Sequence, residues 1–171
     1  MNIVLCGFKN CGKTTYGKRL AKELGREFFD IDDIIVEQYL QQFKEKLSIR
    51  EIYAKIGNDE FRRLEKEVAG IVAKKDNAVI AAGGGTVMDP DNVKMLKKFG
   101  RLIFLRCPKE TIKERIFKGG IPAFIDADNP YVSFEKIYNE REKQYLAVAD
   151  EIIETHVGAS RWCHLLIKCR S

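Results

Sequence analysis

Residues 7–14 read GFKNCGKT, which matches the G-x-x-x-x-G-K-[ST] pattern of a phosphate-binding loop. We call this stretch the phosphate loop. A tight turn that contains glycine lets backbone N–H groups approach the phosphates of a nucleotide closely. Lys13 can reach the β- and γ-phosphates, and the Thr14 hydroxyl can bind Mg²⁺. Asn10 stands where a small residue or glycine is usual, and asparagine tolerates a positive φ better than most residues.

The segments on either side of the phosphate loop support this interpretation. Residues 2–6 (NIVLC) form an apolar run of strand length before the loop. After the loop, Tyr16, Leu20 and Leu24 recur every four residues, which is typical of a helix. The N-terminus of such a helix carries partial positive charge and would face the phosphates. The sequence therefore predicts a strand–loop–helix unit that binds a nucleotide.

Strand-like and helical segments alternate along the rest of the chain. We expect strands at about 3–6, 27–31, 78–82, 102–105 and 151–154. We expect helices at about 13–24, 33–43, 48–55, 59–75, 90–98, 109–117, 134–148 and 159–168. This alternation predicts an α/β fold with a parallel sheet covered by helices on both faces. A length of 171 residues fits a single domain over 1–171.

Composition narrows the class of protein. The net charge of +5 is modest and basic residues are scattered among acidic ones, so we expect no nucleic-acid partner. The longest mostly apolar stretch, 78–88, is too short to span a membrane, and the N-terminus has no signal-peptide pattern. The five cysteines have no metal-ligand spacing and indicate reduced thiols, which is typical of a cytoplasmic protein. We also expect a monomer that acts on a small molecule.

Two carboxylates follow the second expected strand. Asp30 and Asp32 alternate along it, which predicts that both point to one side of the sheet, near the phosphate loop. One could hold magnesium-bound water while the other accepts a proton from, or orients, an acceptor hydroxyl. Asp32 or Asp33 could instead cap the next helix, and we assign that role to Asp33.

Glycines and arginines complete the candidate site. Residues 81–86 (AAGGGT) end the third expected strand with three glycines, which would leave bare backbone N–H groups beside the phosphate loop. This strand ends without an acidic residue, which assigns the magnesium role to Asp30. Arg62 and Glu65 are three residues apart on a helix and could pair, leaving an arginine oriented to bind a carboxylate. Segment 118–130 (KGGIPAFIDADNP) has Gly and Pro punctuation and no helical period, so we expect a mobile lid at about 117–130.

Taken together, these features resemble the shikimate kinase family over essentially the whole chain. The matching pieces occur in order: the phosphate loop, Asp30-x-Asp32, Phe61-Arg62, the glycine run Gly83-Gly84-Gly85, Arg115, and Arg141 four residues before Tyr145. The resemblance implies a P-loop kinase with a five-stranded parallel sheet, arranged as in nucleoside monophosphate kinases. It also implies phosphorylation of the 3-hydroxyl of shikimate by ATP, with Mg²⁺, a step toward the aromatic amino acids.

The resemblance assigns roles to individual residues. ATP would be bound by Gly7, Asn10, Gly12, Lys13, Thr14, Thr15 and Arg115, the last stacking on adenine. Shikimate would be bound in the region of about 32–65 and beyond by Asp32, Arg62, Glu65, Gly83, Gly84, Gly85 and Arg141, with Tyr53 and Phe61 lining the pocket. Thr14 and Asp30 would serve Mg²⁺, and Lys13 and Asp32 would be the catalytic pair.

Three stretches depart from the family pattern. The lid normally carries Arg-Pro-Leu, and here residues 121–123 read IPA, without an arginine. The Gly-Glu before Phe-Arg is Gly57-Asn58, and the adenine-side loop at 156–161 lacks the expected proline. Lys118 is the nearest cation that could replace the lid arginine; otherwise the enzyme would run slowly.

Two other classes of function remain open at this point. The first is a kinase for another small molecule such as gluconate or a nucleotide, although a nucleotide kinase should carry several lid arginines. The second is a GTP switch or a weakly active, degenerate nucleotide binder. The absence of N-K-x-D and D-x-x-G motifs argues against a GTPase.

Overall fold

The computed structural model of the chain describes residues 1–155, which form a sheet of five parallel strands flanked by helices. The sheet order is β2-β3-β1-β4-β5. Its strands are β1 (Asn2–Cys6), β2 (Phe28–Asp30), β3 (Val79–Ala81), β4 (Gly100–Arg106) and β5 (Glu151–Glu154). All four neighbouring pairs are parallel, which confirms the predicted α/β fold.

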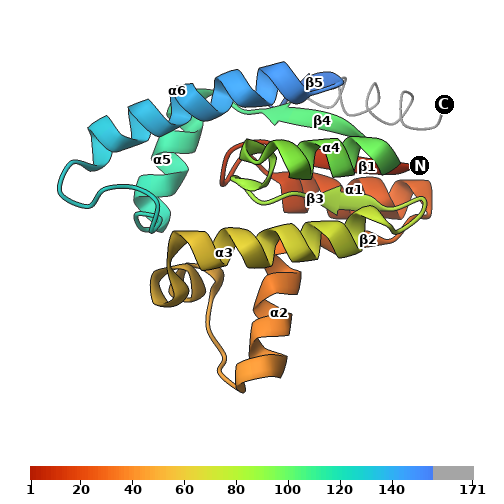
Figure 1. Ribbon diagram of the computed structural model, residues 1–171. Helices are drawn as coiled ribbons and strands as arrows, with labels where there is room; N and C mark the ends of the chain where they lie inside the picture. Colours follow the sequence, from red (N-terminus) through yellow and green to blue (C-terminus); the bar gives the residue numbers. More distant parts are fainter. Residues whose placement is uncertain (156–171) are drawn as a thin grey trace.

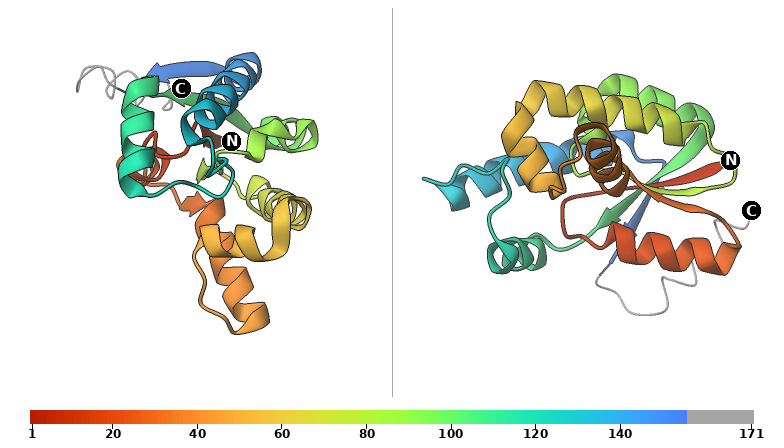
Figure 2. Two further views of the ribbon diagram at one scale, coloured as in Figure 1. Left: turned by 90° about the vertical axis from the view of Figure 1, so that its left-hand side faces the viewer. Right: turned by 90° about the horizontal axis from the view of Figure 1, so that it is seen from below.

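Helices cover both faces of this sheet (Figures 1 and 2). They are α1 (Lys13–Leu24), α2 (Ile31–Phe43), α3 (Ile49–Ala73), α4 (Pro90–Phe99), α5 (Lys109–Gly119) and α6 (Pro130–Val148), with a short 3₁₀ helix η1 (Thr86–Met88). Figure 2 places α1 and α5 on one face and α3 and α4 on the other. Within residues 1–155, no helix combines the length and the apolar character needed to cross a membrane.

The core is built around β1, the central strand. Ile3, Val4, Leu5 and Cys6 are all buried, as expected for a continuous apolar strand covered on both faces. Asn2 is buried as well, and its amide donates hydrogen bonds to the Ala73 and Lys75 carbonyls at 3.0 and 2.7 Å. Its side-chain oxygen accepts from the Ala78 N–H at 2.9 Å, so Asn2 joins the end of α3 to the start of β3.

One predicted helix start was wrong, and one predicted break between helices was confirmed. The helix expected at 33–43 begins at Ile31, because Asp30 rather than Asp33 caps it by accepting a hydrogen bond from the Asp32 N–H at 3.1 Å. The break expected between the helices at 48–55 and 59–75 is confirmed: α3 is interrupted at Gly57, whose φ of 80° and ψ of 171° are not helical. Gly57 can adopt this conformation because it has no Cβ.

The non-helical segment between α5 and α6 is shorter than the lid predicted at about 117–130. Helix α5 continues through Gly119 and α6 begins at Pro130, four residues before the expected 134, so the non-helical part is 120–129. Pro130 occupies the first helical turn, where its missing N–H has no helical partner to lose. The predicted helix at 159–168 and the adenine-side loop at 156–161 lie outside the described residues.

Candidate active site

The phosphate loop has the backbone geometry that its glycines predict. Gly7 and Gly12 have φ values of 146° and 102°, and Asn10 has a φ of 66°, which confirms that asparagine serves here at a positive φ. A Cβ on Gly7 would stand 2.7 Å from the Leu105 carbonyl oxygen, so only glycine fits against β4. Helix α1 begins at Lys13 without an acidic residue in its first turn, which leaves its N-terminus open to an anion.

Lys13 and Thr14 are already oriented by this loop. The Lys13 ammonium donates hydrogen bonds to the Gly7 and Phe8 carbonyls, both at 2.9 Å, and so lies folded over the loop. The Thr14 hydroxyl donates to a carboxylate oxygen of Asp30 at 2.7 Å. This contact joins the phosphate loop to the end of β2 and places two hard oxygen ligands, of the kind that Mg²⁺ prefers, side by side.

Asp30 and Asp32 line the same cavity, but not because they alternate along a strand. Asp30 ends β2, and Asp32 lies in the first turn of α2. Burial, together with the negative charge of Asp30, raises the pKa of Asp32 to about 6, although Lys13 acts in the opposite direction. A carboxylate with a pKa close to neutrality suits the acceptance of a proton from a hydroxyl.

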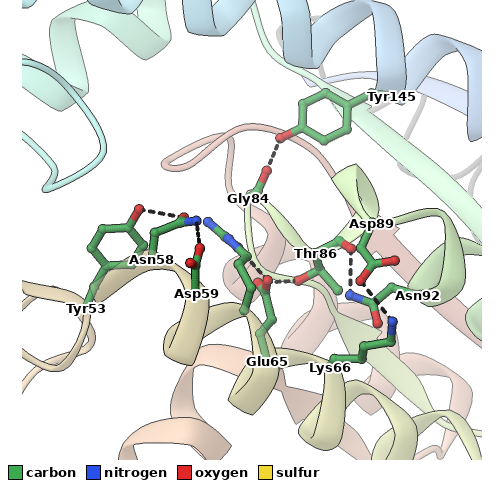
Figure 3. A network of polar contacts seen from close by, with 11 residues as sticks. Tyr53, Asn58, Asp59, Glu65, Lys66, Gly84, Thr86, Asp89, Asn92 and Tyr145 are labelled. Carbon is green, nitrogen blue, oxygen red and sulfur yellow. Dashed lines mark hydrogen bonds and ion pairs between the residues drawn. The ribbon is translucent and has the colours of Figure 1, made fainter. Parts of the chain in front are cut away.

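A buried polar network supports Arg62, and Figure 3 labels its members Glu65, Thr86 and Asn92. Arg62 forms an ion pair with Glu65, whose side chain is 2% exposed. The Thr86 hydroxyl donates to Glu65 at 2.8 Å, and the Asn92 amide donates to the Thr86 carbonyl at 3.0 Å. A Cβ on Gly85 would overlap the Arg62 guanidinium, so the glycine run leaves the space that Arg62 occupies.

Arg141, on α6, lines the same cavity as Arg62. Its guanidinium lies over the rings of Phe124 and Phe8, at 4.4 and 5.5 Å from their centroids. Burial, with the nearby charge of Arg62, lowers the pKa of Arg141. No side chain or carbonyl within residues 1–155 accepts a hydrogen bond from this half-buried guanidinium, which leaves its donors available to an anionic ligand.

The helix that carries Arg141 is tied to the glycine run. The Tyr145 hydroxyl donates to the Gly84 carbonyl at 2.5 Å, and the Gln144 amide donates to the Val87 carbonyl at 3.2 Å. Tyr145 is itself buried, against Phe104. These contacts fix the position of Arg141 relative to Arg62.

One cavity of about 1080 Å³ brings most of the predicted residues together. Of these, the cavity is lined by Asn10, Gly12, Lys13, Thr14, Thr15, Asp30, Asp32, Tyr53, Phe61, Arg62, Glu65, Gly84, Gly85, Arg115 and Arg141. Gly7 and Gly83 do not line it: Gly7 packs against β4, and Gly83 lies behind, where a Cβ would be 2.7 Å from a Glu65 oxygen. Arg115 donates to the Asn10 carbonyl at 2.9 Å, beside the phosphate loop.

Sequence reasoning missed several lining or supporting residues. Thr86 binds Glu65, Phe124 covers Arg141, and Lys9 and Arg50 both line the cavity. Arg50 stands three residues before Tyr53, and this spacing on a helix face could have identified it. For Phe124 the only indication was that it is the sole aromatic residue between 118 and 130.

The assignment of Lys118 to a mobile loop was wrong. Lys118 lies in the last turn of α5, where it pairs with Glu114 at 2.9 Å, and its side chain is 77% exposed. Ile121, which stands where the family carries the lid arginine, is half-buried and packs against the hydrophobic core. The lid therefore presents no cation of its own between 120 and 129.

Several known proteins with a similar sequence or structure are shikimate kinases. The family model for shikimate kinase matches residues 9–168. The shikimate kinases of Francisella tularensis subsp. novicida and Thermodesulfovibrio yellowstonii are both 36% identical to this chain, covering 91% and 90% of it and 85% of each relative.

Solved structures agree with this result. The shikimate kinase of Acinetobacter baumannii, solved in complex with shikimate, superposes with a TM-score of 0.82 at 32% identity, covering 98% of this chain and 89% of that one. The shikimate kinase of Aquifex aeolicus superposes with a TM-score of 0.77 at 29% identity, covering 99% of this chain and 96% of that one. The chain belongs to the shikimate kinase family.

Proposed function

We propose that this protein transfers the γ-phosphoryl group of ATP to the 3-hydroxyl of shikimate. The observation that carries the proposal is the pair formed by Arg62 and Arg141, which both reach the glycine run: a Cβ on Gly85 would overlap the Arg62 guanidinium, and a Cβ on Gly84 would lie 3.6 Å from a guanidinium nitrogen of Arg141. Arg141 has no hydrogen-bonded acceptor within residues 1–155. Such a pair favours an anion between its members, and shikimate offers one carboxylate. Membership of the shikimate kinase family supports the same substrate.

One end of the cavity binds ATP, and the other end binds shikimate. The phosphate loop, with Lys13, binds the phosphates of ATP, and Arg115 serves the adenine side. Arg62 and Arg141 hold the carboxylate of shikimate, with Glu65, the glycine run, Tyr53 and Phe61 around it. Shikimate bound in this way directs a hydroxyl toward Asp32, in the part of the cavity that faces Lys13.

The reaction needs positioning and charge neutralisation more than covalent chemistry by the protein. Asp32 accepts the proton of the 3-hydroxyl, or orients that hydroxyl, as its oxygen attacks the γ-phosphorus. Lys13 neutralises charge on the β- and γ-phosphates. Thr14 and Asp30 would hold Mg²⁺, which neutralises phosphate charge when bound; their oxygens fit a hard cation.

The direct test of this function is a coupled assay of ADP release. Shikimate, gluconate and nucleoside monophosphates are offered in parallel with ATP and Mg²⁺. We expect shikimate-dependent turnover far above that with the other acceptors. Turnover with gluconate alone would reassign the acceptor, and no turnover with any acceptor would favour a degenerate nucleotide binder.

The acceptor arginines give a separate prediction. Replacing Arg62 or Arg141 by alanine should weaken shikimate binding by about 2–4 kcal/mol, roughly 30- to 900-fold, because each loses a charge-assisted pair. The affinity for ATP should barely change, and the two affinities are measured by titration calorimetry. Arg63→Ala is the matched control, since Arg63 lies on the same helix and pairs with Glu60 and Glu67 at the surface.

Arg62→Ala would also leave Glu65 buried without its ion-pair partner, which can destabilise the fold. The double variant Arg62→Ala/Glu65→Gln removes that charge and keeps the test decisive. Parent-like shikimate binding in both arginine variants would place the acceptor elsewhere.

Acidic pH should lower the activity. Asp32 must be ionised to accept a proton, and its pKa is about 6. The kcat/KM for shikimate should therefore fall about tenfold for each pH unit below 6 and level off above it. A profile that stays flat down to pH 5, with the fold intact by circular dichroism, would show that Asp32 is not the titrating base.

We also propose that the protein is a monomeric, cytoplasmic enzyme that works without nucleic acid or membrane. Modest net charge with interspersed acids and bases supports this proposal. Size-exclusion chromatography with light scattering should give a mass close to 19.6 kDa.

A further inference from the structure

Phosphoryl transfer is accelerated when a cation in addition to the phosphate-loop lysine neutralises charge on the transferring phosphoryl group. The lid does not supply one. Ile121 is a half-buried side chain that packs against the core. Lys118, in the last turn of α5, borders the cavity, but its ammonium is paired with Glu114 at 2.9 Å and its side chain is 77% exposed. An unpaired cation on another element that borders the cavity would serve instead.

Arg50 stands at that border. It is the second residue of α3, it lines the cavity, and it faces the start of the lid. A Cβ on Gly120 would lie 3.3 Å from the Arg50 guanidinium, and Gly120 immediately precedes Ile121. The first turns of α3 lie opposite the C-terminal end of α5 in Figure 1, at the left of the view. A guanidinium is thus present next to the place where the family carries its lid arginine.

The sequence holds Arg50 in this position through a capping box. The Ser48 N–H donates to Glu51 at 2.8 Å, and the Glu51 N–H donates to the Ser48 hydroxyl at 3.3 Å, which fixes the first turn of α3. One turn later, Tyr53 packs against Phe61 with 5.0 Å between ring centroids. The backbone that carries Arg50 is therefore part of the acceptor pocket rather than of the lid.

The Arg50 guanidinium is also available. Within residues 1–155 it forms no ion pair and no hydrogen bond, although the surface arginine of the same helix, Arg63, has two carboxylate partners. An unpaired guanidinium that lines a phosphate-binding cavity keeps its planar set of donors free for phosphate oxygens.

We propose that Arg50 supplies the guanidinium that this lid lacks, and that it binds the oxygens of the γ-phosphoryl group during transfer. Arg50 makes no covalent bond and moves no proton; it neutralises charge that spreads over the phosphoryl oxygens. The inference rests on the proposed phosphoryl transfer to shikimate. It assigns the role to α3, not to Lys118.

Four variants test the assignment: Arg50→Ala, Arg50→Lys, Arg63→Ala as the matched control, and Arg50→Ala/Ile121→Arg. Arg50→Ala should lower kcat at least tenfold and change the KM for shikimate less than threefold. Arg50→Lys should restore only part of the loss, because an ammonium lacks the bidentate geometry. Arg63→Ala should match the parent, and the added Ile121→Arg should recover part of kcat.

A second readout does not depend on the acceptor. The protein is titrated into a fluorescent ADP analogue in the presence of Mg²⁺, once with and once without aluminium fluoride. Aluminium fluoride imitates the transferring phosphoryl group. Arg50→Ala should weaken the aluminium fluoride complex at least tenfold and leave binding of the ADP analogue alone unchanged. If the parent shows no shikimate turnover, the proposed function fails, and this titration still judges Arg50. Parent-like behaviour of Arg50→Ala in the titration would overturn the inference.

Discussion

Replacing Lys13 by methionine should lower shikimate-dependent turnover by three or more orders of magnitude. The Lys13 ammonium is held over the phosphate loop by the Gly7 and Phe8 carbonyls, where its charge would meet the β- and γ-phosphates. Methionine keeps the length of the side chain and removes the charge. Most of the catalysis in phosphoryl transfer comes from such electrostatic stabilisation, so the chemical step should suffer most.

The measurement is kcat from coupled ADP release at saturating ATP and shikimate. Lys22→Met is the matched control, because Lys22 is exposed in the last turn of the same helix and lies outside the cavity. Thermal unfolding should be close to that of the parent for both variants. Turnover within tenfold of the parent in Lys13→Met would mean that residues 7–14 do not bind the transferring phosphates.

The second large effect is expected from Asp32→Asn. The amide keeps the shape of the side chain but cannot accept the hydroxyl proton, so kcat should fall by about 10²- to 10⁴-fold. The acidic limb of the pH profile should disappear with it. Asp33→Asn is the matched control, since Asp33 is the next residue, is exposed and does not line the cavity. Equal loss in both variants would contradict a specific role for Asp32.

Asp32→Asn should raise stability while it lowers activity. The pKa of Asp32 is raised in the folded protein, so its contribution to the free energy of unfolding is fully present below the ordinary value of 3.8 and is lost as the pH rises through about 6. At pH 7.5 the parent therefore keeps a charge that the fold disfavours, beside Asp30. Thermal unfolding at pH 7.5 should show a higher midpoint for Asp32→Asn, and the difference should shrink at pH 5.

Local patterns predicted much of the fold. The phosphate loop, the apolar run of β1 and the alternation of β and α segments each depend on neighbours in sequence, and each was confirmed. Boundaries failed where one side chain decides them. Asp30 caps α2 two residues earlier than the pattern suggested, and Pro130 starts α6 before its apolar period becomes visible.

Long-range contacts explain what the sequence could not predict about the site. Thr86 supports Glu65 from a different element, and the Arg50 guanidinium meets the lid only after α3 and α5 are brought together. Neither contact can be recognised from the spacing of residues along the sequence. In contrast, the pairing of Arg62 with Glu65 spans three residues on one helix and could be predicted from spacing.

The attachment of α6 to the glycine run bears on inhibitor resistance. Tyr145 anchors Arg141 through a main-chain oxygen of Gly84, and a side chain on Gly85 would overlap Arg62. A drug that donates hydrogen bonds to the carbonyl oxygens of Gly84 and Gly85 would contact atoms that no point mutation removes. Substitutions that block such a drug sterically at Gly85 would also displace Arg62, so escape from the drug would carry a loss of substrate binding.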